Sequence, residues 1–149
     1  MRKILGKNFF EDDALKVAEN LLGKYLIRKV NGKEITLRIN EVEAYDGFDD
    51  KASHASKGKT DRNKVMFGDA GNWYIYLVYG MHNMLNVVTG KEHYPAAILI
   101  RGAGDISGPG KLTKFLKIDK KLNGKKASVE TGLWFEDRGE SVDKKKIKR

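Results

Sequence analysis

The alternation of hydrophobic and polar residues predicts a helix and then a long β-hairpin at the start of the chain. Apolar residues recur at helical spacing over Glu11–Leu22, and Gly23 is a typical residue to end a helix. Lys24–Val30 and Lys33–Tyr45 have the pattern of strands, and Asn31-Gly32 between them is a strong signal for a hairpin turn. We therefore expect these two strands to pair antiparallel.

The second strand of this hairpin carries carboxylates where its pattern predicts a buried face. Its aliphatic residues occupy odd-numbered positions and should face the core: Ile35, Leu37 and Ile39. The same parity places Glu41, Glu43 and Tyr45 on that inner face. Such a strand is either bulged there or enters a cavity that holds an acid. The second alternative makes Glu43 a candidate site residue, and spacing alone does not separate it from Glu41.

The remainder of the chain predicts a long loop, four more strands and one short helix. The loop is the polar segment Asp46–Ala70, and connections of this length are usually functional. Strands are expected over Trp73–Tyr79, Asn83–Thr89, Pro95–Gly102 and Leu133–Glu136. A helix should open at Ser107–Lys111 and run to Leu116, and residues 144–149 should form a disordered basic tail. We predict an α+β fold, a single domain over residues 1–149 with a curved, mainly antiparallel sheet flanked by helices.

Charge and composition narrow the classes of function. The 149 residues carry a formal net charge of +9, which attracts a polyanion, so nucleic acid is the first partner to test. The alternative is that this charge only solvates the surface. Cysteine is absent, which excludes disulfides, thiol catalysis and cysteine-ligated zinc, including that of the zinc deaminases. No apolar run suits a membrane span or signal peptide, so we expect a protein inside the cell, cytoplasmic or nuclear, and no membrane partner.

Three local motifs leave their chemistry open. Gly108-Pro109-Gly110-Lys111 lacks the spacing of a nucleoside triphosphate loop, but its backbone N–H groups and Lys111 suit a DNA phosphate, or it is an ordinary turn. The three histidines lack the spacing of a zinc site, so we expect no metal and no cofactor. The aromatic segment Trp73–His82 serves either core packing or base stacking.

Seven segments, in this order, resemble the alkyladenine (3-methyladenine) DNA glycosylases. They are Glu41–Tyr45, Ala52–Ala55, Thr60–Asn63, Met66–Gly68, Tyr74–His82, Ala97–Arg101 and Ser107–Leu112. The resemblance covers the chain from the first helix to about Asn123. It implies that Glu43 is the general base that activates water, and that Arg101 lies beside this water and the phosphate of the lesion.

The same resemblance implies a role for eight further residues. Those that would line the pocket for the extruded base are Tyr45, His54, Tyr76 and Asn86, the last crowding the amino group of guanine. Those that would intercalate in the duplex are Tyr79 and Met81, and those that would contact the DNA backbone are Lys111 and Arg62. Aromatic rings suit an electron-poor, often cationic alkylated purine through stacking and cation–π attraction.

The function implied is that of a monofunctional, monomeric base-excision repair enzyme. It would flip alkylated or deaminated purines (3-methyladenine, 7-methylguanine, hypoxanthine) out of double-stranded DNA and hydrolyse the N-glycosidic bond. The family usually continues past the equivalent of Lys146 with a segment that helps close the pocket, which the chain lacks. One alternative is therefore a catalytically impaired protein that binds damaged DNA. A less favoured alternative is an RNA-associated domain, because the family's fold resembles a domain of a transfer-RNA formyltransferase.

Overall fold

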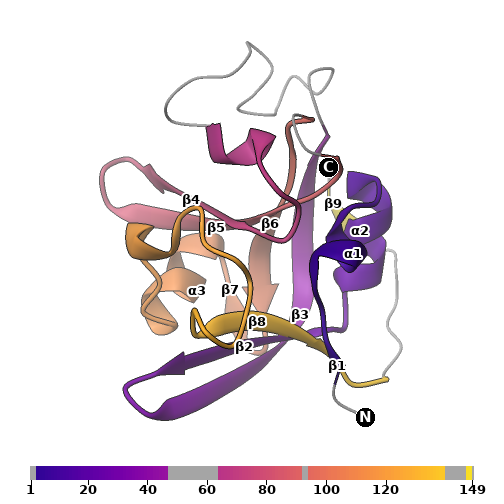
Figure 1. Ribbon diagram of the computed structural model, residues 1–149. Coiled ribbons are helices and arrows are strands. Elements are labelled where there is room, and N and C mark those ends of the chain that lie inside the picture. Colours follow the sequence, from indigo (N-terminus) through magenta and orange to yellow (C-terminus); the bar gives the residue numbers. More distant parts are fainter. Residues whose placement is uncertain (1–2, 47–63, 92–93, 140–146, 149) are drawn as a thin grey trace.

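The computed structural model describes residues 3–46, 64–91, 94–139 and 147–148, which form a curved sheet with helices packed against it (Figure 1). The strands lie in the order β1-β8-β2-β3-β6-β5-β4, with β7 beside β6 and β9 beside β3. Their bounds are β1 Lys3–Ile4, β2 Tyr25–Val30, β3 Lys33–Asp46, β4 Trp73–Val78, β5 His82–Val88, β6 Ala96–Ala103, β7 Ile106–Ser107, β8 Leu133–Asp137 and β9 Ile147–Lys148. The helices are α1 Lys7–Phe10, α2 Ala14–Leu21 and α3 Pro109–Phe115, with short 3-10 turns η1 Lys64–Phe67 and η2 Lys120–Leu122. The predicted α+β class is confirmed.

The sheet curls until strands from its two ends touch. The ring centroids of Trp73, on the terminal strand β4, and Phe135, on β8, lie 5.0 Å apart. The Trp73 indole N–H also donates to the Leu133 carbonyl at 3.1 Å. The main hydrophobic core lies inside this curve, covered by α2 and α3.

The helix predicted before the first hairpin is present as α2. It begins three residues later than the pattern suggests, because Asp13 caps it by accepting a hydrogen bond from the Lys16 N–H at 3.4 Å. Its buried residues recur every three or four positions and enter the main core: Ala14, Val17, Ala18 and Leu21. No helix within the described ranges is long and apolar enough to cross a membrane.

The face predicted for Glu43 is wrong, because β3 changes face midway. Ile39 pairs with Ala103, but the register against β6 shifts on both sides of Glu41. Beyond this bulge the even-numbered residues Val42 and Ala44 join Ile39 in the main core. The bulge alternative therefore holds, and it turns Glu43 to the opposite face of the sheet.

The described part of the expected C-terminal tail is also ordered. Ile147–Lys148 form β9, which pairs in parallel with Val42 and Glu43. Strand β2 pairs with β3 only as far as Ile39. Beyond Ile39, the backbone N–H and C=O groups on the β2 side of β3 can therefore pair with another strand. The short strand therefore lies against the segment that carries Glu43.

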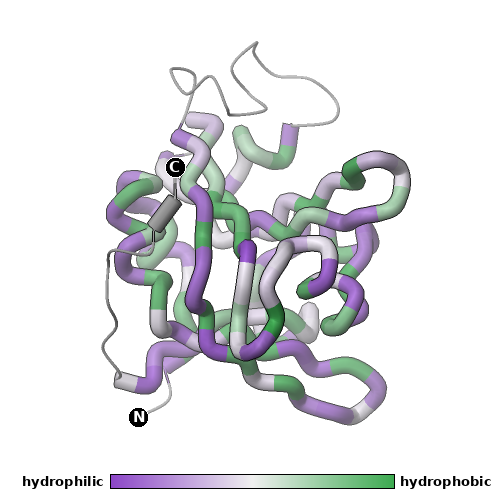
Figure 2. Tube along the Cα trace, turned by 180° about the vertical axis from the view of Figure 1, so that it is seen from behind, coloured by the Kyte–Doolittle hydropathy of each residue, from purple (hydrophilic) through white to green (hydrophobic). Residues whose placement is uncertain are grey.

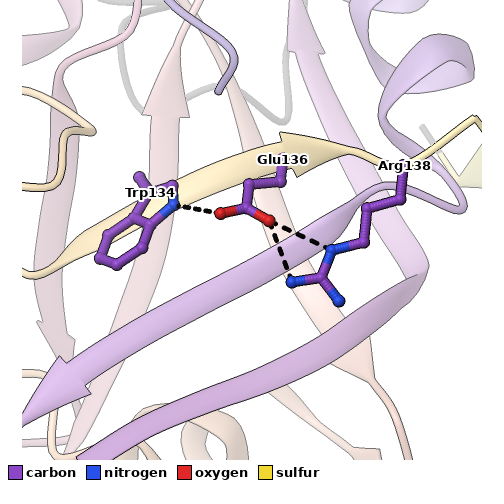
Figure 3. A network of polar contacts seen from close by, with 3 residues as sticks. All are labelled: Trp134, Glu136 and Arg138. Atoms are coloured by element: carbon purple, nitrogen blue, oxygen red, sulfur yellow. Dashed lines mark hydrogen bonds and ion pairs between the residues drawn. The ribbon is translucent and has the colours of Figure 1, made fainter. Parts of the chain in front are cut away.

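A buried carboxylate fixes the outer end of β8 (Figure 3). Glu136 is 2% exposed and accepts hydrogen bonds from the Trp134 indole at 2.9 Å and from Arg138 Nε and Nη2 at 3.1 and 2.9 Å. The Arg138 guanidinium also lies over the Tyr25 ring, 4.6 Å from its centroid. The network compensates the burial of the charge and ties β8 to β2.

Two hairpins project from the same side of the molecule and differ in hydropathy. In Figure 1 both point to the left, with α3 between them. The turn of β2–β3 is mostly hydrophilic, whereas the β4–β5 hairpin is more hydrophobic toward its turn (Figure 2). Strand β4 ends at Val78, and Met81 directly precedes β5. Met81 is 70% exposed, which favours a surface that meets a partner.

Candidate functional site

A row of four side chains crosses the sheet on the face opposite the main core. Glu43 pairs with Leu99 of β6, Leu99 with Asn86 of β5, and Asn86 with Tyr74 of β4. Directly opposed residues in antiparallel strands share a face, so these four side chains do. Two strand spacings separate Glu43 from Asn86, about 10 Å, which is wide enough for a purine.

Both carboxylate oxygens of Glu43 accept a hydrogen bond. The Tyr45 hydroxyl donates to Oε1 at 2.5 Å, and Arg101 Nη1 donates to Oε2 at 3.1 Å. The Glu43 side chain is 19% exposed, so it is partly desolvated and still reachable by water. Each carboxylate oxygen has a second lone pair, so Glu43 keeps the capacity to accept a proton from a bound water.

Tyr45 holds its proton firmly in this position. Burial first, and then the hydrogen bond to Glu43, raise the pKa of its hydroxyl well above the ordinary value, and nearby Tyr76 contributes to the same rise. Tyr45 is therefore a hydrogen-bond donor to Glu43 over the physiological pH range.

The two predicted pocket tyrosines lie on opposite sides of the Glu43 row. Tyr45 pairs with Ala97, on one side, and Tyr76 pairs with Met84, on the other. Tyr76 is 6% exposed and packs in a second small core with Tyr74, their ring centroids 5.2 Å apart. The aromatic segment thus contributes to packing, while Tyr76 also borders the candidate site.

Asn86 is held rigidly in this row, on strand β5. It is 1% exposed, and its Nδ2 donates to the carbonyls of Tyr74 and Met84, both at 3.3 Å. These bonds fix the plane of the amide.

Arg101 has an unused donor. Its Nη1 pairs with Glu43, but its Nε is buried and has no acceptor among the described residues. A buried guanidinium N–H without a partner is costly, and an anionic ligand oxygen would compensate it.

The β4–β5 turn presents Tyr79 to solvent in a strained backbone conformation. Tyr79 is 90% exposed and has φ of 54°, followed by Gly80 at 67°. Positive φ is unfavourable for an aromatic residue, and such strain is typical of functional positions. Met81 follows in the same turn, so the two predicted intercalating residues form one exposed tip.

Lys111 lies near this tip, and the helix that carries it starts beside Arg101. The Gly108 N–H donates to the Arg101 carbonyl at 2.8 Å, which anchors the start of α3 beside the Glu43 row. Lys111, in the first turn of α3, lines a hollow of about 280 Å³ together with Tyr79. The predicted residues His54 and Arg62 lie outside the described residues.

Some residues of the site carry no signal in a strand or motif pattern. Gly102, at the bulge, has no side chain, and a Cβ there would lie 2.9 Å from Asn40 Oδ1 and 3.4 Å from the Glu41 Cβ. Within the described ranges no three His, Asp or Glu side chains lie close enough to hold a metal ion.

Comparison with known proteins gives one consistent family. The family model described as methylpurine-DNA glycosylase (MPG) matches residues 8–106. A "Putative 3-methyladenine DNA glycosylase" of Methanocella arvoryzae is 44% identical over 161 residues, covering 95% of this chain and 80% of the relative. A protein with the same name from Legionella pneumophila (strain Paris) is 51% identical and covers 83% of this chain and 70% of the relative. Another from Borreliella afzelii is 43% identical and covers 93% of this chain and 81% of the relative. The chain therefore belongs to the methylpurine-DNA glycosylase family and is a DNA glycosylase, an enzyme that binds DNA as its substrate.

Proposed function

We propose that the protein is a monofunctional, monomeric DNA glycosylase that removes alkylated or deaminated purines from double-stranded DNA, with Glu43 as the general base. The observation that carries this proposal is the Glu43 carboxylate, which is hydrogen-bonded at both oxygens, is one-fifth exposed and lies in the same row as Asn86. Substrates of the 3-methyladenine, 7-methylguanine and hypoxanthine type fit the aromatic borders of this row.

Glu43 would act on a water held near the sugar. The water oxygen forms a bond to C1′ of the damaged nucleotide, its proton passes to Glu43, and the C1′–N bond breaks with its electron pair leaving on the base. Positive charge develops on the sugar during this step, and a carboxylate at its face stabilises it. An alkylated purine already carries a positive charge and leaves neutral. Hypoxanthine needs protonation or a hydrogen bond as it leaves, so we expect slower release.

Selectivity would arise from the residues around the row. Tyr45 and Tyr76 border it on either side and would stack on the extruded base, with a larger gain for a cationic than a neutral ring. Asn86, fixed by its two backbone contacts, would crowd the exocyclic amino group of guanine. The expected role of His54 in this pocket concerns a residue outside the described ranges.

Engagement of DNA would use the exposed turn and the charge of the protein. Tyr79 and Met81 would fill the gap that the extruded base leaves, as apolar wedges do in bent DNA. The exposed part of the Arg101 guanidinium and the ammonium of Lys111 would then meet phosphates of the damaged strand. Arg62, outside the described ranges, is expected to add a further phosphate contact.

The test compares two glutamates on the same strand. A duplex with one hypoxanthine or alkylated adenine is incubated with parent, Glu43→Gln and Glu41→Gln protein, and abasic sites are then cleaved with alkali. We expect alkali-dependent cleavage with the parent and Glu41→Gln but not with Glu43→Gln, which should still bind the duplex. Cleavage by Glu43→Gln at the parental rate would refute the assignment, and loss only in Glu41→Gln would transfer the role to Glu41.

The same samples test the monofunctional mechanism. An enzyme that uses an amine nucleophile is trapped on DNA by borohydride through its Schiff base. We expect no trapped complex and no strand cleavage before alkali. Lesion binding without any base release in the parent would instead favour the damaged-DNA binding protein.

A further inference from the structure

The β4–β5 hairpin is bordered by two separate hollows, one on each side. The first, of about 280 Å³, is lined by Val78, Met84 and Lys111. The second, of about 330 Å³, is lined by Met81, Asn83 and Lys114. The wall between them includes His82, which lines both.

The two hollows open on opposite faces of the hairpin. Met84 pairs with Tyr76, so it points to the face that carries the Glu43 row. Asn83 is its neighbour in the strand and points to the other face. The second hollow is therefore separated from the candidate catalytic site by the hairpin itself.

The second hollow offers hydrogen-bond donors and no acid. Lys114 is exposed and has no ion pair with a described residue, and the Asn83 side-chain amide has no hydrogen-bond partner among them. The His82 ring adds a third polar group, and no residue that lines the hollow is acidic. This combination suits an anion, and a phosphate diester is the anion that DNA provides.

The walls of this hollow are held together by specific contacts. Thr113, 2% exposed, donates through Oγ1 to the Asn83 carbonyl at 2.8 Å. Gly110 allows the His82 ring to approach α3, because a Cβ at this position would lie 2.9 Å from His82 Nδ1. Lys114 and Asn83 are thus presented from two elements whose relative position is fixed.

We propose that this second hollow, with Lys114 and Asn83, binds a backbone phosphate of the undamaged strand, opposite the lesion. A hairpin whose tip fills the gap of an extruded base lies between the two backbones of the duplex. The damaged strand must reach Glu43 and so passes on the side of Lys111. The undamaged strand then passes on the side of Lys114. This inference rests on the proposed wedge function of Tyr79.

Binding is measured by fluorescence anisotropy with a duplex that holds an uncleavable abasic analogue, over a series of salt concentrations. The proteins are the parent, Lys114→Ala, the conservative Lys114→Arg, and Lys33→Ala as control. Lys33, the first residue of β3 beside the turn of the other hairpin, is exposed and has no ion pair with a described residue, so its loss removes the same charge elsewhere. We expect only Lys114→Ala to reduce the slope of log K against log salt, by about 1, as loss of one phosphate contact requires.

Uncharged methylphosphonates then locate the phosphate. At one or two positions of the undamaged strand, they should weaken binding by the parent and have no further effect on Lys114→Ala, because each change removes the same contact. The proposal would be overturned if the Lys114→Ala substitution cancelled the effect of a methylphosphonate in the damaged strand. It would also be overturned if every methylphosphonate weakened binding equally in the parent and in Lys114→Ala.

A single-stranded substrate separates this inference from the proposed function. It has no undamaged strand, so parent and Lys114→Ala should release its damaged base equally. A selective loss by Lys114→Ala on the single strand would refute the proposed contact. Failure of the parent to release a base from any substrate would refute the proposed function instead. The methylphosphonate experiment would still test the phosphate contact, because it measures binding and not base release.

Discussion

Replacing Tyr45 by phenylalanine removes one hydroxyl from the candidate site and leaves its aromatic ring in place. The lost group donates to Glu43 Oε1 at 2.5 Å, so among the described residues the carboxylate keeps its hydrogen bond from Arg101 alone. The expected effect is slower base release with little change in lesion binding, because the stacking surface remains.

The structure sets the size of this effect. A hydrogen bond to a charged group contributes about 1.5–3 kcal/mol, and the partial exposure of Glu43 favours the lower part, about 1.5–2 kcal/mol. Each 1.4 kcal/mol on an activation barrier is about a factor of ten. We therefore expect Tyr45→Phe to release the base roughly 10- to 30-fold more slowly.

Single-turnover release from a duplex with one damaged purine measures this rate. Tyr94→Phe is the matched control, since the Tyr94 hydroxyl donates to another carboxylate, Asp46, at 3.2 Å. Release by Tyr45→Phe at the rate of the parent would refute the reasoning that this hydroxyl positions Glu43. An equal loss in Tyr94→Phe would show that the effect is not specific to Glu43.

The pH dependence of stability gives a second readout of the same substitution. Burial, followed by the bond to Glu43, raises the pKa of Tyr45 above its ordinary value of 10.0. Above about pH 10 the unfolded chain loses this proton while the folded protein retains it, so stability falls as pH rises. Tyr45→Phe lacks this contribution and should lose less stability between about pH 9 and about pH 11. Equal losses in urea titrations of both proteins would contradict the raised pKa.

Three further substitutions test other parts of the structure. Tyr79→Gly should raise the free energy of unfolding by up to about 1 kcal/mol, because glycine tolerates the positive φ, yet slow release from duplex but not single-stranded DNA. A fall in stability, or parental activity on the duplex, would contradict this. Glu136→Ala should lower the free energy of unfolding by about 3 kcal/mol in urea titrations, since it leaves Arg138 without its buried partner, and a negligible change would refute this. Deleting residues 147–149 should slow base release with little change in the thermal midpoint, because β9 pairs with Val42 and Glu43 and with no other described strand. Unchanged release would remove β9 from the site.

Local pattern was sufficient to predict most secondary structure. Turn chemistry at Asn31-Gly32 identified the β2–β3 hairpin, and helical spacing before Gly23 identified α2. These features depend on neighbours in the chain, which is why they can be read from it. Motif resemblance, rather than periodicity, singled out Glu43 over Glu41.

The face of the sheet on which Glu43 lies was decided only by the tertiary structure. Strand parity predicts one face from Ile39 to Tyr45, but the bulge at Glu41 exists because two distant strands pair around Gly102. Both strands change face there, because Ile39 and Val42 are three residues apart yet both enter the main core, as do their partners Ala103 and Ile100. The same long-range pairing brings Arg101 to Glu43 across 58 residues of sequence. Sequence alone therefore determined which residues to consider, and the pairing of strands decided which of them meet.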